Sequence, residues 1–187
     1  MRLGKRGEPA KEKLSSLEVV RRLDDLFIGR GSPDAIHKLK EEFSITASET
    51  EIFLCLAAQY LVGFLDAFQS REGIPLPQGL FKTIAQGLAD SILMHGSLGG
   101  PPHETHGVLY QKLKKITDGL LEVWERHEDK APNPQWYVAK EVCYLLNGRD
   151  KMPHPGLVTL LSSQISNDTK SIKKLFKELE KTHVLVK

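Results

Sequence analysis

Residues 52–68 constrain the fold of this chain more than any other segment, because they form one long apolar run. The run follows Ser48 and Glu51, which match the S/T-x-x-E capping box that marks the first turn of a helix. Gln59 and Asp66 interrupt its apolar side chains. A helix without a polar face is normally enclosed by other helices. We therefore expect a central helix here, with the rest of the protein packed around it.

The two polar interruptions and the length of this run bear on its environment. The run is shorter than the roughly 20 residues that a bilayer span requires, so the sequence predicts no membrane insertion. Buried polar groups need partners, and for Gln59 and Asp66 we expect hydrogen bonds to neighbouring helices. A ligand cavity between helices is the alternative.

Composition and cysteine usage indicate an intracellular globular protein. Hydrophobic residues make up 40% of the chain and charged residues 27%, which is typical of folded rather than disordered chains. Cys55 and Cys143 lie in apolar stretches, so we interpret them as reduced core thiols in a reducing, cytoplasmic compartment. Residues 1–13 have no apolar run behind their basic side chains, so they read as a disordered basic tail rather than a signal peptide.

Local signals predict helices along most of the remaining chain. Ser15 and Glu18 form a second capping box, and Ser32 with Pro33 opens a short helix. Further helices are expected at residues 80–94, 105–127, 136–146, 157–165 and 169–182. No repeat and no series of alternating strands is present, so the predicted fold class is all-α.

The Pro-rich segment at residues 131–135 divides the chain into parts of opposite charge. Residues 131–187 carry nine Lys/Arg against five Asp/Glu, a net charge of +4, whereas the whole chain carries +2. Such an uneven distribution of charge along the chain gives information about binding partners but not about the fold. We predict a multi-helix bundle at residues 14–130 and a small separate module at residues 131–187.

The order of elements in this module resembles a known superfamily. A short apolar helix at residues 157–165 leads to the polar triplet Ser166-Asn167-Asp168, and a second helix ends at Leu179-Glu180 before Val184-Leu-Val186. This resembles the second and third helices of a winged helix-turn-helix, followed by the first strand of the wing. Residues 136–146 would supply the first helix. The resemblance implies that the helix from residue 169 is a recognition helix for duplex DNA.

Charge on that last helix agrees with binding to a polyanion. Apolar side chains recur at helical spacing on one face, and lysines recur on another, so lysines can neutralise phosphates. Residues at the start of a recognition helix read base edges in the major groove. The predicted nucleic-acid-binding residues are Asn167, Thr169, Lys170, Ser171, Lys173, Lys174, Lys177 and Lys181.

Candidate chemistry elsewhere in the chain does not match any catalytic or metal-binding pattern. His95, His103 and His106 lie close together, but the H-E-T-H spacing differs from H-E-x-x-H, and both cysteines are distant in sequence. The glycine-rich residues 96–100 lack the Gly-Lys-Ser/Thr ending of a P-loop. We expect loop histidines, no metal, no cofactor and no catalytic residue.

The preferred functional prediction is a DNA-binding regulatory protein that acts in transcription or another DNA transaction. The bundle at residues 14–130 would then dimerise or sense a protein partner. The alternative is a helical adaptor or complex subunit, whose apolar stripes dock another helix. An enzyme that uses scattered residues is the third option.

Overall fold

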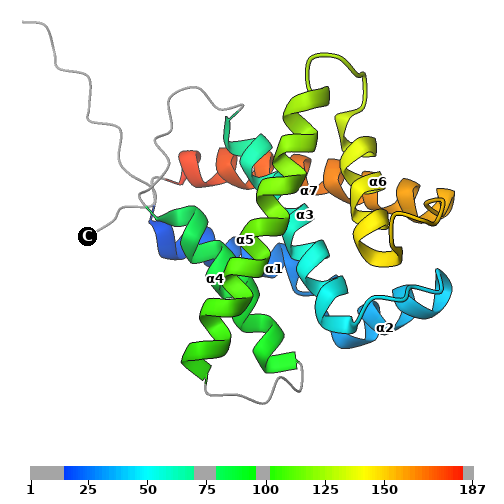
Figure 1. Cartoon of the computed structure of the whole chain (residues 1–187). Helices are drawn as coiled ribbons and strands as arrows, with labels where there is room; N and C mark the ends of the chain where they lie inside the picture. The colour runs from blue at the N-terminus through cyan, green and yellow to red at the C-terminus, as the bar shows by residue number, and fades with distance from the viewer. Residues whose placement is uncertain (1–14, 70–78, 96–101, 183–187) are drawn as a thin grey trace, which may run out of the picture.

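The computed structural model describes residues 15–69, 79–95 and 102–182, and these form seven α-helices and no strand. The helices are α1 (Ser16–Phe27), α2 (Pro33–Glu42), α3 (Glu49–Gln69), α4 (Leu80–His95), α5 (Pro102–His127), α6 (Pro134–Asn147) and α7 (Pro155–Lys181). Figure 1 shows their arrangement. The all-α fold class is therefore confirmed.

Three helices begin where the sequence places their caps. The hydroxyl of Ser15 accepts a hydrogen bond from the amide of Glu18, and the hydroxyl of Ser32 caps α2 in the same way. At α3 the capping box is reciprocal: Glu51 donates its amide to Ser48 Oγ, and its carboxylate accepts the amide of Ser48 at 2.8 Å. These bonds satisfy first-turn amides that have no partner within the helix.

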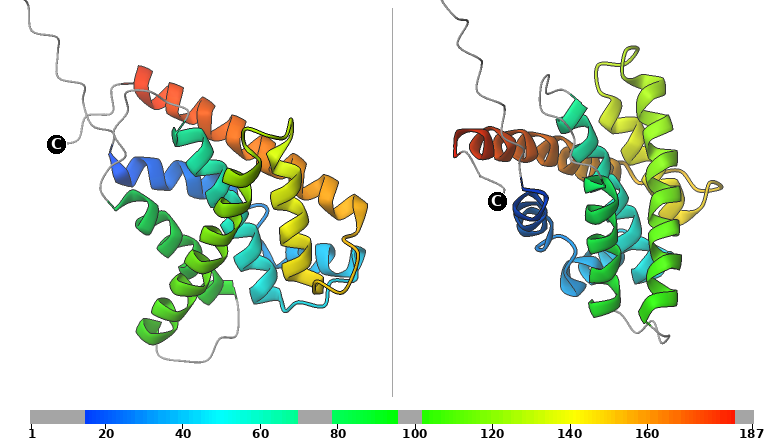
Figure 2. Two further views of the ribbon diagram at one scale, coloured as in Figure 1. Left: turned by 45° about the horizontal axis from the view of Figure 1, so that its top comes forward. Right: turned by 90° about the vertical axis from the view of Figure 1, so that its left-hand side faces the viewer.

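The central position of α3 is also confirmed. Fifteen of its 21 residues are buried, and it packs against α2, α4, α5, α6 and α7. The two further views in Figure 2 show it enclosed by these neighbours. Among the described residues, α3 alone is long and apolar enough to cross a membrane, and most of that stretch is buried by other helices.

The polar groups of α3 make contacts with α7. Gln59 Nε2 donates to the carbonyl of Leu161 at 3.4 Å, which confirms the expected bond between helices. Asp66 Oδ2 lies 3.9 Å from Lys173 Nζ, close enough for an ion pair. Burial raises the pKa of Asp66, and Lys173 opposes that rise. Both polar side chains thus contact α7, and the buried Oε1 of Gln59 has no hydrogen-bond partner among the described residues.

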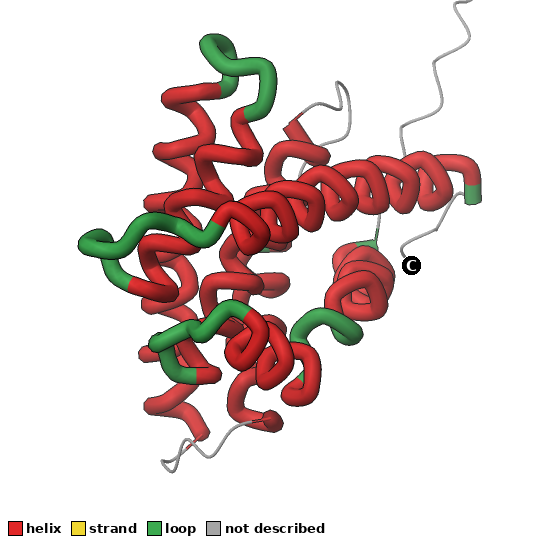
Figure 3. Tube along the Cα trace, turned by 90° about the vertical axis from the view of Figure 1, so that its right-hand side faces the viewer, coloured by secondary structure: helices red, strands yellow, loops and turns green. Residues whose placement is uncertain are grey.

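The predicted turn at residues 166–168 is wrong. Helix α7 runs without interruption from Pro155 to Lys181, so the two predicted helices are one. Figure 3 shows this helix as a continuous tube. No helix-turn-helix exists in the described part of residues 131–187. The predicted strand at residues 184–186 lies outside the described residues, as do the tail at 1–13 and the loop at 96–100.

Tertiary contacts explain why the polar triplet stays helical. Asp168 does not cap a new helix, because its carboxylate pairs with Arg30, 138 positions earlier in the chain. The hydroxyl of Thr169 donates to the carbonyl of Ile165 within the same helix. At this point α7 crosses α3 closely over Gly63, where an added Cβ would lie 3.3 Å from Asp168 Cβ. Tertiary partners thus override a local preference for a cap or turn.

Helices from both predicted domains share one hydrophobic core. Helix α7 packs against α3 and α6, and α6 also packs against α5. The ring of His127, at the end of α5, stacks on Tyr137 of α6 at a centroid distance of 3.7 Å. The boundary predicted at residue 131 therefore coincides with a short connection between helices that contact each other.

Candidate functional site

The residues predicted to bind DNA lie on different sides of α7. Lys170, Lys174, Lys177 and Lys181 are exposed, and so are Asn167 and Ser171. Thr169 is buried, and Lys173 is half-buried beside Asp66. The structure therefore brings the four exposed lysines together as a row but removes Thr169 from the surface.

The lysine row lies directly opposite the face of α7 that packs against the bundle. Its members are three or four residues apart, so they follow one another along one side of the helix. Lys174 Nζ lies 3.9 Å from Glu178 Oε1, which offsets part of the positive charge. The predicted winged-helix module is not confirmed, because α7 is a bundle helix and does not project as a recognition helix.

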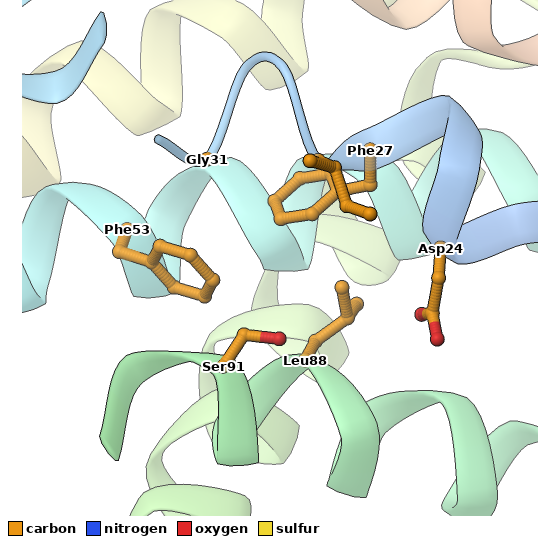
Figure 4. A pocket seen from close by; sticks show the side chains of 7 residues that line it. Asp24, Phe27, Gly31, Phe53, Leu88 and Ser91 are labelled. Atoms are coloured by element: carbon orange, nitrogen blue, oxygen red, sulfur yellow. The ribbon is translucent and has the colours of Figure 1, made fainter. Parts of the chain in front are cut away.

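A pocket that the sequence did not predict lies between α1, α3 and α4. It is lined by Asp24, Phe27, Ile28, Gly31, Phe53, Leu88 and Ser91 and has a volume of about 110 Å³. Figure 4 shows Asp24 of α1 extending toward α4, which contributes the side chains of Leu88 and Ser91. The lining residues are thus far apart in the sequence, with 67 positions between Asp24 and Ser91.

The floor of this pocket is apolar and tightly built. The rings of Phe27 and Phe53 meet edge to face at a centroid distance of 5.6 Å, and both side chains are almost fully buried. Gly31 lies against both rings, because a Cβ at this position would be 2.9 Å from Phe27 and 3.0 Å from Phe53. Any larger residue at Gly31 would displace the rings.

A buried ion pair holds the loop that carries Gly31. The guanidinium of Arg30 makes two hydrogen bonds to the Asp168 carboxylate, at 2.6 and 2.7 Å. It also lies over the rings of Phe27 and Tyr60, with centroid distances of 5.4 and 5.7 Å. This bidentate contact orients the loop, and it connects the floor of the pocket to α7.

Asp24 differs from Asp168 in having no partner. In the described part of the chain its carboxylate makes no hydrogen bond or ion pair, although the side chain is half-buried. Burial raises the pKa of Asp24, and the neighbouring carboxylate of Asp25 raises it further. A carboxylate held in this way gains stability when a cation approaches it.

Exposed apolar side chains occur on the rim of the pocket and farther along α1 and α4. Ile28 on its rim is 64% exposed, and Leu17, which lies on the same side of α1, is 73% exposed. On α4, Met94 lies three residues beyond Ser91 and is 86% exposed. Large apolar groups are usually removed from water when partners for them exist. Exposed apolar groups thus occur on the rim of the pocket and farther along the two helices that carry it.

Ser91 supplies the hydroxyl group of the pocket, and the hydrogen bond that this hydroxyl makes does not suit a nucleophile. Its Oγ donates to the carbonyl of Gly87 at 3.0 Å, and no histidine lines the pocket. Nucleophilic catalysis by serine needs a base within hydrogen-bonding distance. In the described residues, no hydrogen bond joins Ser91 to Asp24, which is the one ionisable residue of the pocket lining.

The histidine and cysteine side chains form no site in the described residues. His106 contacts the carboxylate of Asp90, and no group of three metal-ligating residues occurs in the described part of the chain. The side chains of His95 and His103 lie outside the described set. Burial raises the pKa of Cys55 to about 12 and that of Cys143 to about 11, so both thiols are poor nucleophiles at neutral pH.

Sequence reasoning missed the pocket because its residues come from three separate segments. The one local signal is the sequence Gly29-Arg30-Gly31, which places an arginine between two glycines directly after an apolar helix. Only the packing of α1 against α3 and α4 assigns a role to it. No protein-family model, curated protein or solved structure matches this chain.

Proposed function

We propose that this protein is a helical interaction protein, an adaptor or a subunit of a complex, and that it binds its partner through the pocket between α1 and α4. The observation that carries this proposal is a small pocket with a mainly apolar lining and the exposed side chain of Ile28 on its rim. Pockets that receive one anchoring side chain, surrounded by further contacts, dominate the binding energy of many protein interfaces.

The size of the pocket favours a protein partner over a cofactor or metabolite. Sites for small molecules usually enclose about 300–1,000 Å³ and bury most of the ligand. The pocket here measures about 110 Å³, which suffices for a single side chain. Ile28 on its rim, together with Leu17 and Met94 farther along α1 and α4, would add contacts that a small ligand could not reach.

A site-specific photo-crosslinker tests this proposal directly. Placed at Ile28, on the rim of the pocket, it is expected to give one discrete protein adduct in extract of the source cells, with or without nuclease. The matched control carries the same crosslinker at Ser163, which is exposed on α7 and is not part of the pocket. No adduct from Ile28, or the same adduct from both positions, would contradict the proposal. An adduct of twice the chain mass would identify self-association instead of a different partner.

DNA binding is a second candidate, and the exposed row of Lys170, Lys174, Lys177 and Lys181 favours it. Without a helix-turn-helix, such binding would depend on phosphate contacts and would show little sequence preference. Four phosphate contacts predict a slope of roughly −3 to −4 for log K against log salt concentration. Fluorescence anisotropy with duplex DNA at low salt measures this slope. Absence of binding at micromolar protein would exclude this candidate.

A further inference from the structure

We propose that the pocket between α1 and α4 binds the side chain of a lysine from the partner protein, with its ammonium group on Asp24. The aliphatic part of the lysine would lie along the apolar floor. This inference rests on the proposed function, since it specifies the chemistry of the anchoring residue at the same site.

Charge at the pocket selects a cation. Asp24 has no cationic partner in the described part of the chain, and the charged neighbour that shifts its pKa is another acid, Asp25. The nearby guanidinium of Arg30 is already neutralised by two hydrogen bonds to Asp168. An incoming ammonium group would therefore meet an uncompensated carboxylate, in a place where partial burial strengthens the attraction.

Apart from the Ser91 hydroxyl, which is bonded within α4, the remaining lining is apolar and selects an aliphatic stem next to that cation. Phe27, Phe53 and Leu88 are each at most 3% exposed and present carbon atoms to the pocket. Long cationic side chains bury their methylene groups on apolar surface while the charged end reaches a polar group. The separation between apolar floor and acidic edge in Figure 4 matches this division.

Volume distinguishes lysine from arginine. An apolar cavity of about 150 Å³ accommodates benzene, so the 110 Å³ of this pocket accommodates roughly four or five non-hydrogen atoms. Lysine has a stem of four carbons and a compact ammonium group, whereas arginine carries a larger planar guanidinium. A single carboxylate at the edge of the pocket also suits the compact charge of an ammonium group better than the wider guanidinium.

An NMR titration of the whole 187-residue chain with side-chain analogues tests the inference. The probes are n-butylammonium for lysine, n-propylguanidinium for arginine and 1-butanol as the neutral isostere, at constant ionic strength. We expect n-butylammonium to shift the amide signals of Gly31 and Ser91 saturably, with a Kd in the millimolar range that is typical of so small a ligand. The other two probes should bind at least about fivefold more weakly, because 1-butanol lacks the charge and n-propylguanidinium is too large for the pocket.

Two isosteric variants provide the matched comparison. Asp24→Asn removes the charge in the pocket and should weaken n-butylammonium binding about fivefold to tenfold, to the level of 1-butanol. Asp25→Asn removes the same charge from the adjacent exposed residue and should leave the Kd within about twofold. Equal binding of 1-butanol and n-butylammonium, or equal effects of the two variants, would overturn the inference.

The outcome also separates this inference from the proposed function. If the Ile28 crosslink forms but n-butylammonium does not bind, the protein has a partner whose anchor is not lysine, and only the inference fails. If n-butylammonium binds but no protein crosslinks, the pocket takes free amines, and the assignment to a partner's lysine is overturned. Tighter binding of n-propylguanidinium would replace lysine by arginine and overturn the volume argument.

Discussion

Replacing Arg30 by methionine tests how the loop between α1 and α2 is held. The change removes both hydrogen bonds to Asp168 and keeps a flexible side chain of similar length. The side chains of Arg30 and Asp168 are only 14% and 13% exposed, so water can solvate the remaining carboxylate only poorly. Removing one partner of a buried ion pair typically costs about 3–5 kcal/mol. Because the pair here retains slight exposure, we expect a loss of about 3 kcal/mol in the free energy of unfolding.

Urea denaturation followed by circular dichroism measures this loss, and thermal unfolding provides a second measurement. For a chain of 187 residues, 3 kcal/mol corresponds to a decrease of roughly 6–12 °C in Tm. Asp168→Asn and the double variant complete a double-mutant cycle, in which we expect a coupling energy of about 2 kcal/mol. Arg30→Lys should cost less than Arg30→Met, because it keeps the charge but loses the bidentate geometry.

The pH dependence of the Arg30→Met deficit gives an independent check. Burial raises the pKa of Asp168, and Arg30 opposes this effect, so removing Arg30 should raise that pKa further. A carboxyl whose pKa is higher in the folded state destabilises the fold above that pKa, and protonation relieves the cost. The deficit should therefore be largest at neutral pH and shrink as the pH falls toward 4. A loss below 1 kcal/mol, or a deficit that does not change with pH, would refute this account.

Three further predictions concern packing, thiols and the unpaired carboxylate. Gly63→Val should cost about 1–3 kcal/mol in a denaturant titration, because its Cβ would press on Asp168 and Thr169 where α3 crosses α7; a neutral effect would show that the helices can separate freely. Cys55 should react with a thiol reagent only after unfolding, given its burial and its pKa of about 12, and rapid reaction of the native protein would contradict this. Asp24→Asn should raise Tm at pH 7, whereas Asp25→Asn should not. The reason is that the raised pKa of Asp24 means that its negative charge disfavours the folded state at neutral pH. A lower Tm for Asp24→Asn would indicate a partner for the carboxylate.

Local patterns predicted the helices well, because capping is a short-range interaction. Ser48 and Glu51 are three residues apart and satisfy each other's backbone amides whatever the rest of the chain does. The apolar character of α3 likewise predicted its central place, since no orientation of this helix could leave a polar face in water. Both predictions depend only on residues within one segment.

The errors arose where a residue's partner lies far away in the sequence. The triplet that contains Asp168 predicts a turn because aspartate often caps helices, and no local feature indicates the ion pair with Arg30. The sequence pattern places Thr169 among the base-contacting residues, yet the close approach of α7 to Gly63 buries its side chain. The prediction that Lys170, Lys174, Lys177 and Lys181 share one side of the helix is confirmed, because helical spacing alone determines which side chains lie together.

The sequence by itself thus determined the all-α class, the start of three helices and the central role of α3. Only the tertiary structure decided that α7 is one helix and that α1, α3 and α4 enclose a pocket with an unpaired Asp24. The physical reason is range: hydrogen bonds within a turn and helical periodicity are set by neighbouring residues, whereas ion pairs and pockets depend on which helices pack together.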